Sequence, residues 1–203
     1  MWQVEKGYVF IFMLFFPNLK SVQILFDNRY KQDQYNDCLL SVDGTDFQIP
    51  KRGREWYSFK FKKSGVRYEV ALSILGGEIC WISGPHQPGV YNDLDIFRSS
   101  LASHLDPFER VEADDGYLGE APLRVKCPAC ITVPAEKQQM MKRVCSRQET
   151  INRRFKHWQI LKQVYSHNIR VHRNVFAAIA VISQLAIQNG EPLFSLSILM
   201  IDE

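Results

Sequence analysis

The stretch Cys38-Leu39-Leu40-Ser41-Val42-Asp43-Gly44 is a short apolar run that ends on an acid and a glycine. An apolar run bounded by a turn signal predicts a buried strand over residues 38–42, with Asp43 at its end. A second predicted strand, residues 111–113, leads into Asp114 and Asp115-Gly116. Two such strand ends can bring carboxylates together at the rim of a sheet. Their repulsion then requires a cation or a proton, and oxygen ligands of this kind suit magnesium or manganese. Taken singly, each aspartate is more typical of a turn residue before glycine than of a metal ligand.

The surrounding pattern predicts a mixed sheet covered by helices. Residues 66–75 and 79–83 read as two strands joined by the turn Gly76-Gly77, which makes a hairpin. Apolar spacing of three and four predicts a helix over residues 92–105. Long helical patterns are also expected from Lys137 onward and over residues 175–187. Strands that alternate with helices in this order favour the α/β class.

One acid stands out in the long basic segment near the C-terminus. Between Lys137 and Arg173 there are ten lysines and arginines, and Glu149 is the only acid. A solvated helix usually mixes the two signs, so a lone glutamate has two interpretations. It pairs with Arg153 one turn on, or it points inward to complete a metal site while the cations face a phosphate backbone. The second interpretation accounts for both the basic excess and the lone acid.

Composition limits the class of protein. The 203 residues include 46% hydrophobic and 23% charged side chains with a net charge of +3, which is typical of one globular domain and not of a disordered chain. Five cysteines without framework spacing predict a reducing compartment. The apolar run Tyr8–Phe16 is too short to span a bilayer, so no membrane association is expected. We expect an N-terminal extension (1–37), which can also be read as the remnant of a truncated region, a domain over 38–190 and a tail over 191–203.

Four segments resemble, in order, the DDE superfamily endonuclease domain of Harbinger-type transposases. Residues 41–47 (SVDGTDF) are similar to the family's I-D-G-T-H segment, with Asp46 in place of its histidine. Residues 84–97 match a P-G-x-x-x-D-x-x-x-F segment at Gly89, Asp93 and Phe97, and residues 113–117 match D-x-G-Y. Residues 147–156 resemble the R-x-x-E-x-x-x-x-x-L-K pattern in outline. Each motif is short, but four in the right order are fairly specific.

The resemblance implies an RNase H-like fold, in which a mixed sheet is flanked by helices. It assigns Asp43, Asp114 and Glu149 as catalytic carboxylates that hold a divalent metal, Mg²⁺ or Mn²⁺, expected as two ions. The implied activity is that of a nuclear DNA endonuclease and strand transferase, which cuts phosphodiesters at transposon ends. The implied partners are double-stranded DNA, a separate Myb-like DNA-binding protein and a second copy of the chain. The alternative is a domesticated or decayed transposase-derived nuclease or DNA-binding protein without transposition.

Two further groups of residues carry open alternatives. The expected contacts to the DNA backbone are Arg147, Arg153, Arg154 and Lys156, although the same cations can simply solvate a helix. The basic, aromatic segment 51–63 suits stacking on bases, but a hairpin with one packed face explains it equally. A rival, non-enzymatic hypothesis is a zinc-stabilised interaction domain built around Cys127 and Cys130, whose spacing lacks a second pair of ligands.

Overall fold

A computed structural model describes residues 26, 27, 29, 38–130, 135–194 and 196. Its centre is a mixed sheet of six strands. The long strands β1 (Cys38–Gln48), β3 (Lys63–Ser73) and β4 (Ile79–His86) run antiparallel, with β3 between the other two. On the other edge of β1, the short strands β5 (Arg110–Glu112) and β6 (Val125–Lys126) add in parallel, and β2 (Tyr57–Ser58) pairs with the start of β3.

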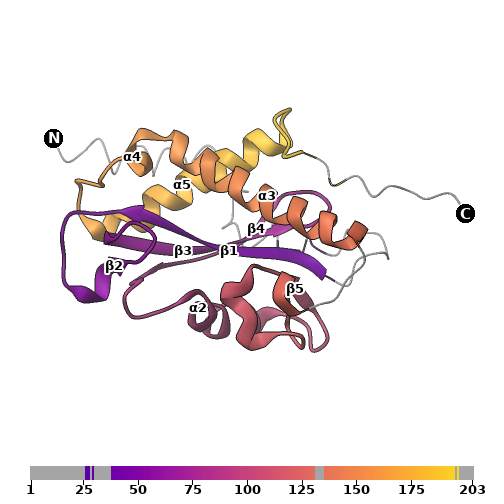
Figure 1. Cartoon of the computed structure of the whole chain (residues 1–203). Helices are drawn as coiled ribbons and strands as arrows, with labels where there is room; N and C mark the ends of the chain where they lie inside the picture. Colours follow the sequence, from indigo (N-terminus) through magenta and orange to yellow (C-terminus); the bar gives the residue numbers. More distant parts are fainter. Residues whose placement is uncertain (1–25, 28, 30–37, 131–134, 195, 197–203) are drawn as a thin grey trace, which may run out of the picture.

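Helices cover both faces of this sheet (Figure 1). The helices α3 (Ala135–His157), α4 (Gln159–Lys162) and α5 (Ile169–Gln188) lie on one face. The opposite face carries α2 (Asp93–Ser99). Within residues 38–130, four short 3-10 segments connect these elements: Arg54–Trp56, Leu101–His104, Asp115–Glu120 and Pro128–Cys130. The mixed α/β architecture predicted from the sequence is therefore confirmed.

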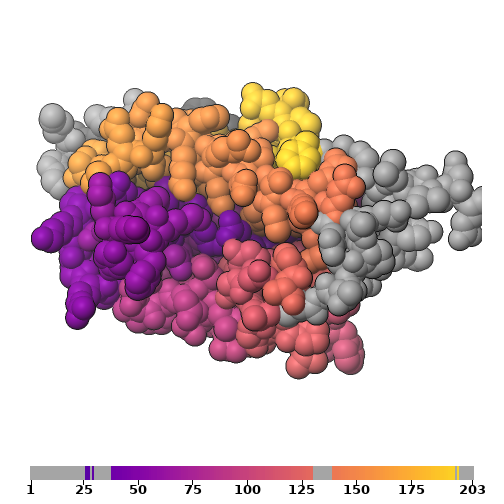
Figure 2. All heavy atoms as spheres, in the orientation of Figure 1, coloured from indigo at the N-terminus to yellow at the C-terminus, as the bar shows by residue number. Residues whose placement is uncertain are grey.

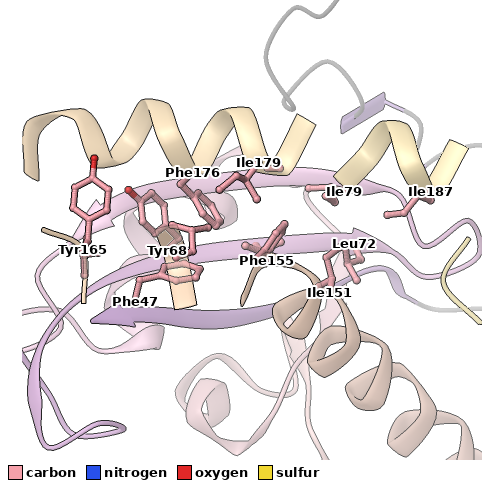
Figure 3. Close-up of a cluster of buried hydrophobic side chains, with 14 of the residues drawn as sticks. Phe47, Tyr68, Leu72, Ile79, Ile151, Phe155, Tyr165, Phe176, Ile179 and Ile187 are labelled. Carbon is pink, nitrogen blue, oxygen red and sulfur yellow. The ribbon is translucent and has the colours of Figure 1, made fainter. Parts of the chain in front are cut away.

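The larger core lies between the sheet and the helices α3, α4 and α5 (Figure 3). Aromatic rings dominate it: the Tyr68 and Phe176 rings stack with centroids 4.0 Å apart, and Phe155 and Phe47 pack edge-on or tilted against Phe176 at 5.1 and 5.2 Å. Rings of this size each bury a large apolar area, and truncating one to alanine typically costs about 3–5 kcal/mol. This core fixes α3 against β1, which matters because both elements carry predicted site residues.

Several predicted boundaries differ from the observed ones. The first strand does not end at Asp43 but continues to Gln48, because β3 pairs with it over this whole length. Asp43 is therefore a mid-strand residue. The predicted hairpin around Gly76-Gly77 is confirmed. The predicted helix 92–105 ends at Ser99 and continues as a 3-10 turn, and β6 lies in a segment predicted to be loop.

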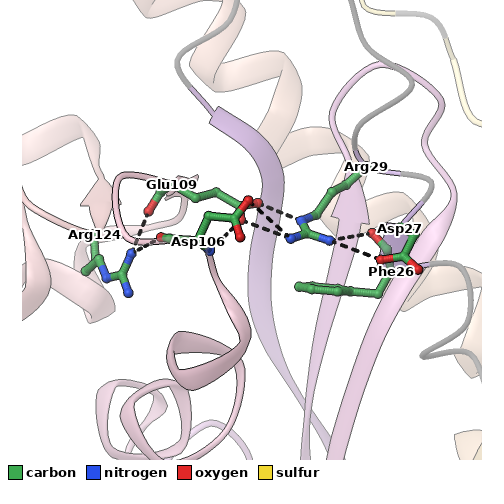
Figure 4. Close-up of polar contacts among 6 residues, drawn as sticks. All are labelled: Phe26, Asp27, Arg29, Asp106, Glu109 and Arg124. Carbon is green, nitrogen blue, oxygen red and sulfur yellow. Dashed lines mark hydrogen bonds and ion pairs between the residues drawn. The ribbon is translucent and has the colours of Figure 1, made fainter.

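Part of the expected N-terminal extension packs on the domain (Figure 4). Arg29 is 2% exposed, and its Nε and Nη2 donate to the two carboxylate oxygens of Glu109 at 2.8 and 3.2 Å. The guanidinium also lies 3.7 Å from the centroid of the Phe26 ring, which packs in turn on Trp81. A bidentate, buried pair of this kind fixes the segment to the turn before β5. The apolar run 8–16 lies outside the described residues.

The start of the expected C-terminal tail is also packed. Leu193 and Leu196 are each 5% exposed, and Leu196 lies in a small apolar cluster with Cys38, Ile74 and Val144. The described part of this segment therefore covers the end of the sheet where β1 begins.

Candidate functional site: an acidic cluster beside β1

The first predicted aspartate lies on β1, and the second lies two residues past the end of the neighbouring strand β5. Ser41 of β1 lies opposite Glu112, the last residue of β5. Continuing this parallel register by two residues sets Asp114 beside Asp43, and the charge of Asp114 acts on Asp43. The strand order therefore places the two acids near each other although they are far apart in sequence.

Asp43 is half-buried and faces α3. Its Oδ2 accepts a hydrogen bond of 2.9 Å from Nδ2 of Asn152. The pKa of Asp43 is raised to about 6, mainly by burial; the positive charge of Lys60 opposes this shift, and the negative charges of Asp114 and Asp93 add to it. The carboxylates are thus close enough to destabilise one another's charge, which is the electrostatic condition that a bound cation would relieve.

Asp93, at the start of α2, is a third acid of this cluster. A Cβ atom on Gly44 would lie 2.1 Å from its Oδ1, so the glycine after Asp43 makes room for this side chain. Burial raises the pKa of Asp93, whereas the positive charge of Arg67 lowers it. Arg67 Nη1 lies 3.1 Å from Asp93 Oδ1, so this acid already has a cationic partner.

Arg67 also holds Asp46, which stands where the resembled family has histidine. Arg67 Nε and Nη2 donate to the two oxygens of the Asp46 carboxylate at 2.6 and 3.0 Å, and Asp46 is fully buried. The substitution is therefore built into an Asp46–Arg67–Asp93 chain of ion pairs. This arrangement positions Asp93 and leaves Asp43 and Asp114 as the acids of the cluster without an ion-pair partner among the described residues.

The two acids at the end of β5 have different roles. Asp114 is exposed and caps the following 3-10 turn, its Oδ1 accepting from the Gly116 amide at 2.9 Å. Asp115 is exposed too, but its Oδ1 accepts from the amide of Ala129 at 3.0 Å. Asp115 thus stabilises the position of the turn that precedes the segment leading to α3. Of these two acids, Asp114 is the one whose charge acts on Asp43.

The face of α3 toward the acids carries Cys145, Gln148 and Asn152. Gln148 Nε2 donates to the carbonyl and the hydroxyl of Ser41 at 2.8 and 2.9 Å, which fixes the helix to β1. Burial raises the pKa of Cys145 to about 11, and the acids that raise it further are Glu112, Asp114, Asp43 and Glu149. One thiol therefore lies near all three predicted metal ligands.

Glu149 lies at the margin of this face. It is one turn after Cys145 and three residues before Asn152, so helical geometry sets its Cβ next to both. Its side chain is exposed, and among the described residues it makes no ion pair, including the alternative one with Arg153. Across the described parts of the chain, no three acidic, histidine or cysteine side chains converge closely enough to hold a metal ion. The structure thus places Asp43, Asp93 and Asp114 within electrostatic range of one another, not within the spacing of a metal site, and leaves Glu149 at the rim.

The four predicted DNA contacts have different environments. Arg147 is 2% exposed and donates to the backbone carbonyls of Ile74 and Phe194, so the prediction of a phosphate contact is wrong for it. Its hydrogen bonds instead hold the C-terminal segment against the sheet. Arg154 donates to the carbonyls of Glu191 and Pro192 at 2.7 and 3.1 Å and is only partly available. Arg153 is exposed, with a single long contact of 3.4 Å to Thr150 Oγ1.

Lys156, the fourth, belongs with Lys60 beside the acidic cluster. Its Nζ lies 5.8 Å from the Phe47 ring and 5.7 Å from the Phe61 ring. Burial lowers its pKa, and Lys60 lowers it further, while Asp46 and Asp43 act in the opposite direction. Two lysines from different elements therefore border the carboxylates. Neither Lys60 nor Asn152 was predicted from the sequence: the only signal of Lys60 was its place in a basic segment, and Asn152 gave none.

Among the described residues, no set of zinc ligands surrounds Cys127. Cys127 is buried, and the side chain of Cys130 lies outside the described residues. Cys145, the nearest other cysteine in the sequence, faces the acidic cluster instead.

Comparison with known proteins identified no relative. No protein-family model, curated protein or solved structure matches the chain. Among the described residues, no helix combines the length and the hydropathy needed to cross a bilayer.

Proposed function

We propose that this chain is the catalytic domain of a divalent-metal-dependent DNA nuclease of the DDE transposase type, with an RNase H-like fold. The observation that carries the proposal is that Asp43 on β1 and Asp114, just past the end of the adjacent parallel strand β5, lie near each other beneath a helix that bears Glu149. The resemblance of four ordered motifs points to the same residues.

The sheet topology supports the fold assignment. Without the two-residue strand β2, the order across the sheet is β4-β3-β1-β5-β6, with the first three strands antiparallel and the last two added in parallel. The first acid lies on the first strand, the second directly follows β5, and the third lies on the next long helix. This is the arrangement that the resemblance implies.

The donor set fits a hard cation. Asp43 and Asp114 provide carboxylate oxygens without an ion-pair partner among the described residues. The pKa of Asp43 is raised mainly by burial and to a lesser extent by the negative charges of Asp114 and Asp93, and a bound cation would oppose both effects. Oxygen ligands of this type suit Mg²⁺ or Mn²⁺. Glu149 completes the set when its side chain turns inward, because its Cβ already lies beside the face that carries Asn152.

The bound cation would lower the pKa of a water molecule and stabilise the leaving oxygen of a phosphodiester, as metal nucleases do. The protein's own groups hold the remaining charges. Asn152 orients the Asp43 carboxylate, and the Arg67 guanidinium neutralises Asp93 so that it does not add a competing charge. Lys60 and Lys156 border the acids, where they would attract the phosphate that is cut.

Double-stranded DNA is the proposed substrate, and water or a 3′-hydroxyl is the proposed nucleophile. Arg153 and Lys156 are the proposed backbone contacts, with Arg154 as a lesser one. A nuclear location, a Myb-like partner and a homo-oligomer are part of the same proposal through the resemblance.

The exposed position of Glu149 favours a second candidate, a transposase-derived DNA-binding protein that no longer cuts. Both candidates predict DNA binding that weakens steeply with salt. They differ in whether metal-dependent nicking accompanies it.

The test is nicking of supercoiled plasmid in Mn²⁺ by the full chain and by four variants. We expect Asp43→Asn, Asp114→Asn and Glu149→Gln each to reduce the nicking rate at least about 100-fold, since each removes a metal ligand. Asp115→Asn is the matched control and should retain most of the activity. Parent-like nicking by Glu149→Gln would exclude the proposed triad, and equal loss in Asp114→Asn and Asp115→Asn would show that the second ligand is misassigned.

A further inference from the structure

The hairpin formed by β2 and β3 borders a groove of about 800 Å³. The groove lies at the end of the sheet where β1 ends and β3 begins. We propose that this groove binds a single-stranded stretch of DNA that continues from the acidic cluster. The identity of the strand as DNA rests on the proposed function, whereas the groove itself does not.

The residues that line the groove carry an excess of positive charge. Five of the residues that line the groove are cations, and none of the described lining residues is acidic. These cations are Lys51, Arg52, Arg54, Lys62 and Lys63. One carboxylate lies beside them, that of Glu55, whose oxygens would be 2.2 and 2.6 Å from a Cβ on the lining residue Gly53. A single acid offsets only part of five positive charges, and a phosphate backbone would relieve the remaining repulsion. A polyanion is therefore the occupant that the charge selects.

Exposed aromatic rings distinguish a single strand from a duplex. Phe59 is 78% exposed and Tyr57 is 37% exposed, and both line the groove. Their ring centroids are 5.2 Å apart at an interplanar angle of 90°. The two rings are thus perpendicular to each other, and Phe59, most of whose surface is exposed, offers a ring face to the solvent. An unstacked base can lie on such a face, whereas the bases of a duplex are already stacked on each other.

Hydrogen bonds hold the groove in shape. The Arg52 amide donates to Ser64 Oγ at 2.9 Å, and the Ile49 amide donates to the Ser64 carbonyl at 3.1 Å. From the other side, the Gly89 amide donates to the Glu55 carbonyl at 3.0 Å, and no Cβ would fit at Gly89, since it would lie 2.2 Å from the Arg54 carbonyl oxygen. A groove held in this way loses little conformational entropy when a strand binds.

The turn of the hairpin links the groove to the acidic cluster. Lys60 lies in the turn between β2 and β3, two residues before the groove-lining Lys62, and its charge acts on both Asp43 and Asp93. The hairpin therefore borders the groove and also approaches the proposed cleavage point. Figure 2 shows this indigo and purple region forming one end of the molecule, next to the orange helices. A strand that leaves the acids along the hairpin passes Lys60 before it meets Tyr57 and Phe59.

The experiment measures binding without chemistry. The full chain, in EDTA, is titrated against a fluorescein-labelled oligo-dT 20-mer and against a labelled duplex of 20 base pairs. We expect Tyr57→Ala/Phe59→Ala to weaken oligo-dT binding at least about tenfold and duplex binding less than about twofold, because only the single strand stacks on the rings. Phe108→Ala is the matched control, since Phe108 is 95% exposed and does not line the groove, and it should change neither affinity. Phe59→Trp restores a stacking surface and should keep the parent affinity.

A salt series tests the cations. Lys51→Ala/Lys62→Ala should reduce the slope of log K against log salt for oligo-dT by about 1.4, from about 0.7 for each single-strand phosphate. Lys142→Ala is the control: Lys142 is exposed on α3 beside Val144, which packs with Cys38 and Ile74 at the opposite end of β1.

Three results would overturn the inference. The first is an equal loss of affinity for oligo-dT and for the duplex in Tyr57→Ala/Phe59→Ala. The second is competition by poly-glutamate that is as strong as competition by unlabelled oligo-dT. The third is tighter binding of an oligo-U strand than of oligo-dT. Failure of nicking leaves these binding results unaffected, so the two proposals fail separately.

Discussion

Asp43 carries an electrostatic cost in the metal-free protein, because burial raises its pKa from 3.8 to about 6. A raised pKa in the folded state means that folding favours the protonated form. The stability from this group is present below pH 3.8 and is lost as the pH rises through about 6, so at pH 7.5 the charged carboxylate opposes folding.

Asp43→Asn should therefore stabilise the metal-free protein at pH 7.5. We expect a gain of about 1–2 kcal/mol, below the ~3 kcal/mol that two pKa units represent, because the site must also accommodate an amide. Thermal unfolding with and without Mn²⁺ measures it. Mn²⁺ should raise the Tm of the parent and of the control Asp95→Asn but not of Asp43→Asn. An equal rise in all three would exclude Asp43 as a ligand.

Glu69 gives a separate pH prediction on the α2 face. Burial raises its pKa to about 7, although Trp81 Nε1 and Ser100 Oγ donate to its Oε1 at 3.1 and 2.6 Å. Its stabilising contribution is thus complete below pH 4.5 and is lost as the pH rises through about 7. Glu69→Gln keeps the acceptor oxygen and removes the titration.

Urea unfolding at pH 5, 6, 7 and 8 tests Glu69. The free energy of unfolding of the parent should fall by about 1–3 kcal/mol more than that of Glu69→Gln over this range. If the free energy of unfolding depends on pH in the same way for the parent and for Glu69→Gln, Glu69 does not titrate between pH 5 and 8.

At the scale of the elements, the ion pair of Arg29 should contribute measurably to the stability of the fold. Arg29→Ala leaves the Glu109 carboxylate, which is 8% exposed by residue, without its bidentate partner. Removing one partner of a buried pair costs about 3–5 kcal/mol. Arg98→Ala is the control, because the Arg98–Glu120 pair of 2.6 Å is largely exposed and should contribute at most about 1 kcal/mol.

Denaturant unfolding measures both variants. A loss below about 1 kcal/mol for Arg29→Ala would mean that this segment does not stabilise the domain.

The elements also show what local sequence predicts and what it misses. The hairpin of β3 and β4 follows from alternation and the Gly76-Gly77 turn, which are local signals. The extension of β1 past Asp43 depends on its pairing with β3, which a local pattern does not reveal. The burial of Arg147 depends on a segment about 47 residues further along the chain, so its charge alone suggested an exposed contact.

In the whole molecule, the sheet order is what assembles the site. The nearness of Asp43 to Asp114 was suggested by an apolar run and a short motif, although the run does not end at Asp43 as predicted. Asp93 reaches the cluster because α2 packs over Gly44, and Lys60 because the hairpin folds back toward α3. The sequence marked Asp93 only through its match to a family segment and Lys60 only through its basic surroundings, because contacts of this kind belong to the tertiary arrangement.

The central claim, that Asp43, Asp114 and Glu149 together hold a divalent metal, is tested most directly by a crystal structure of the full chain soaked in Mn²⁺. The account predicts an anomalous difference peak between the Asp43 and Asp114 carboxylates, with the Glu149 side chain turned in toward it and Mn–O distances of about 2.2 Å. The absence of a peak at these aspartates, or a peak there with Glu149 still directed to solvent, would contradict it.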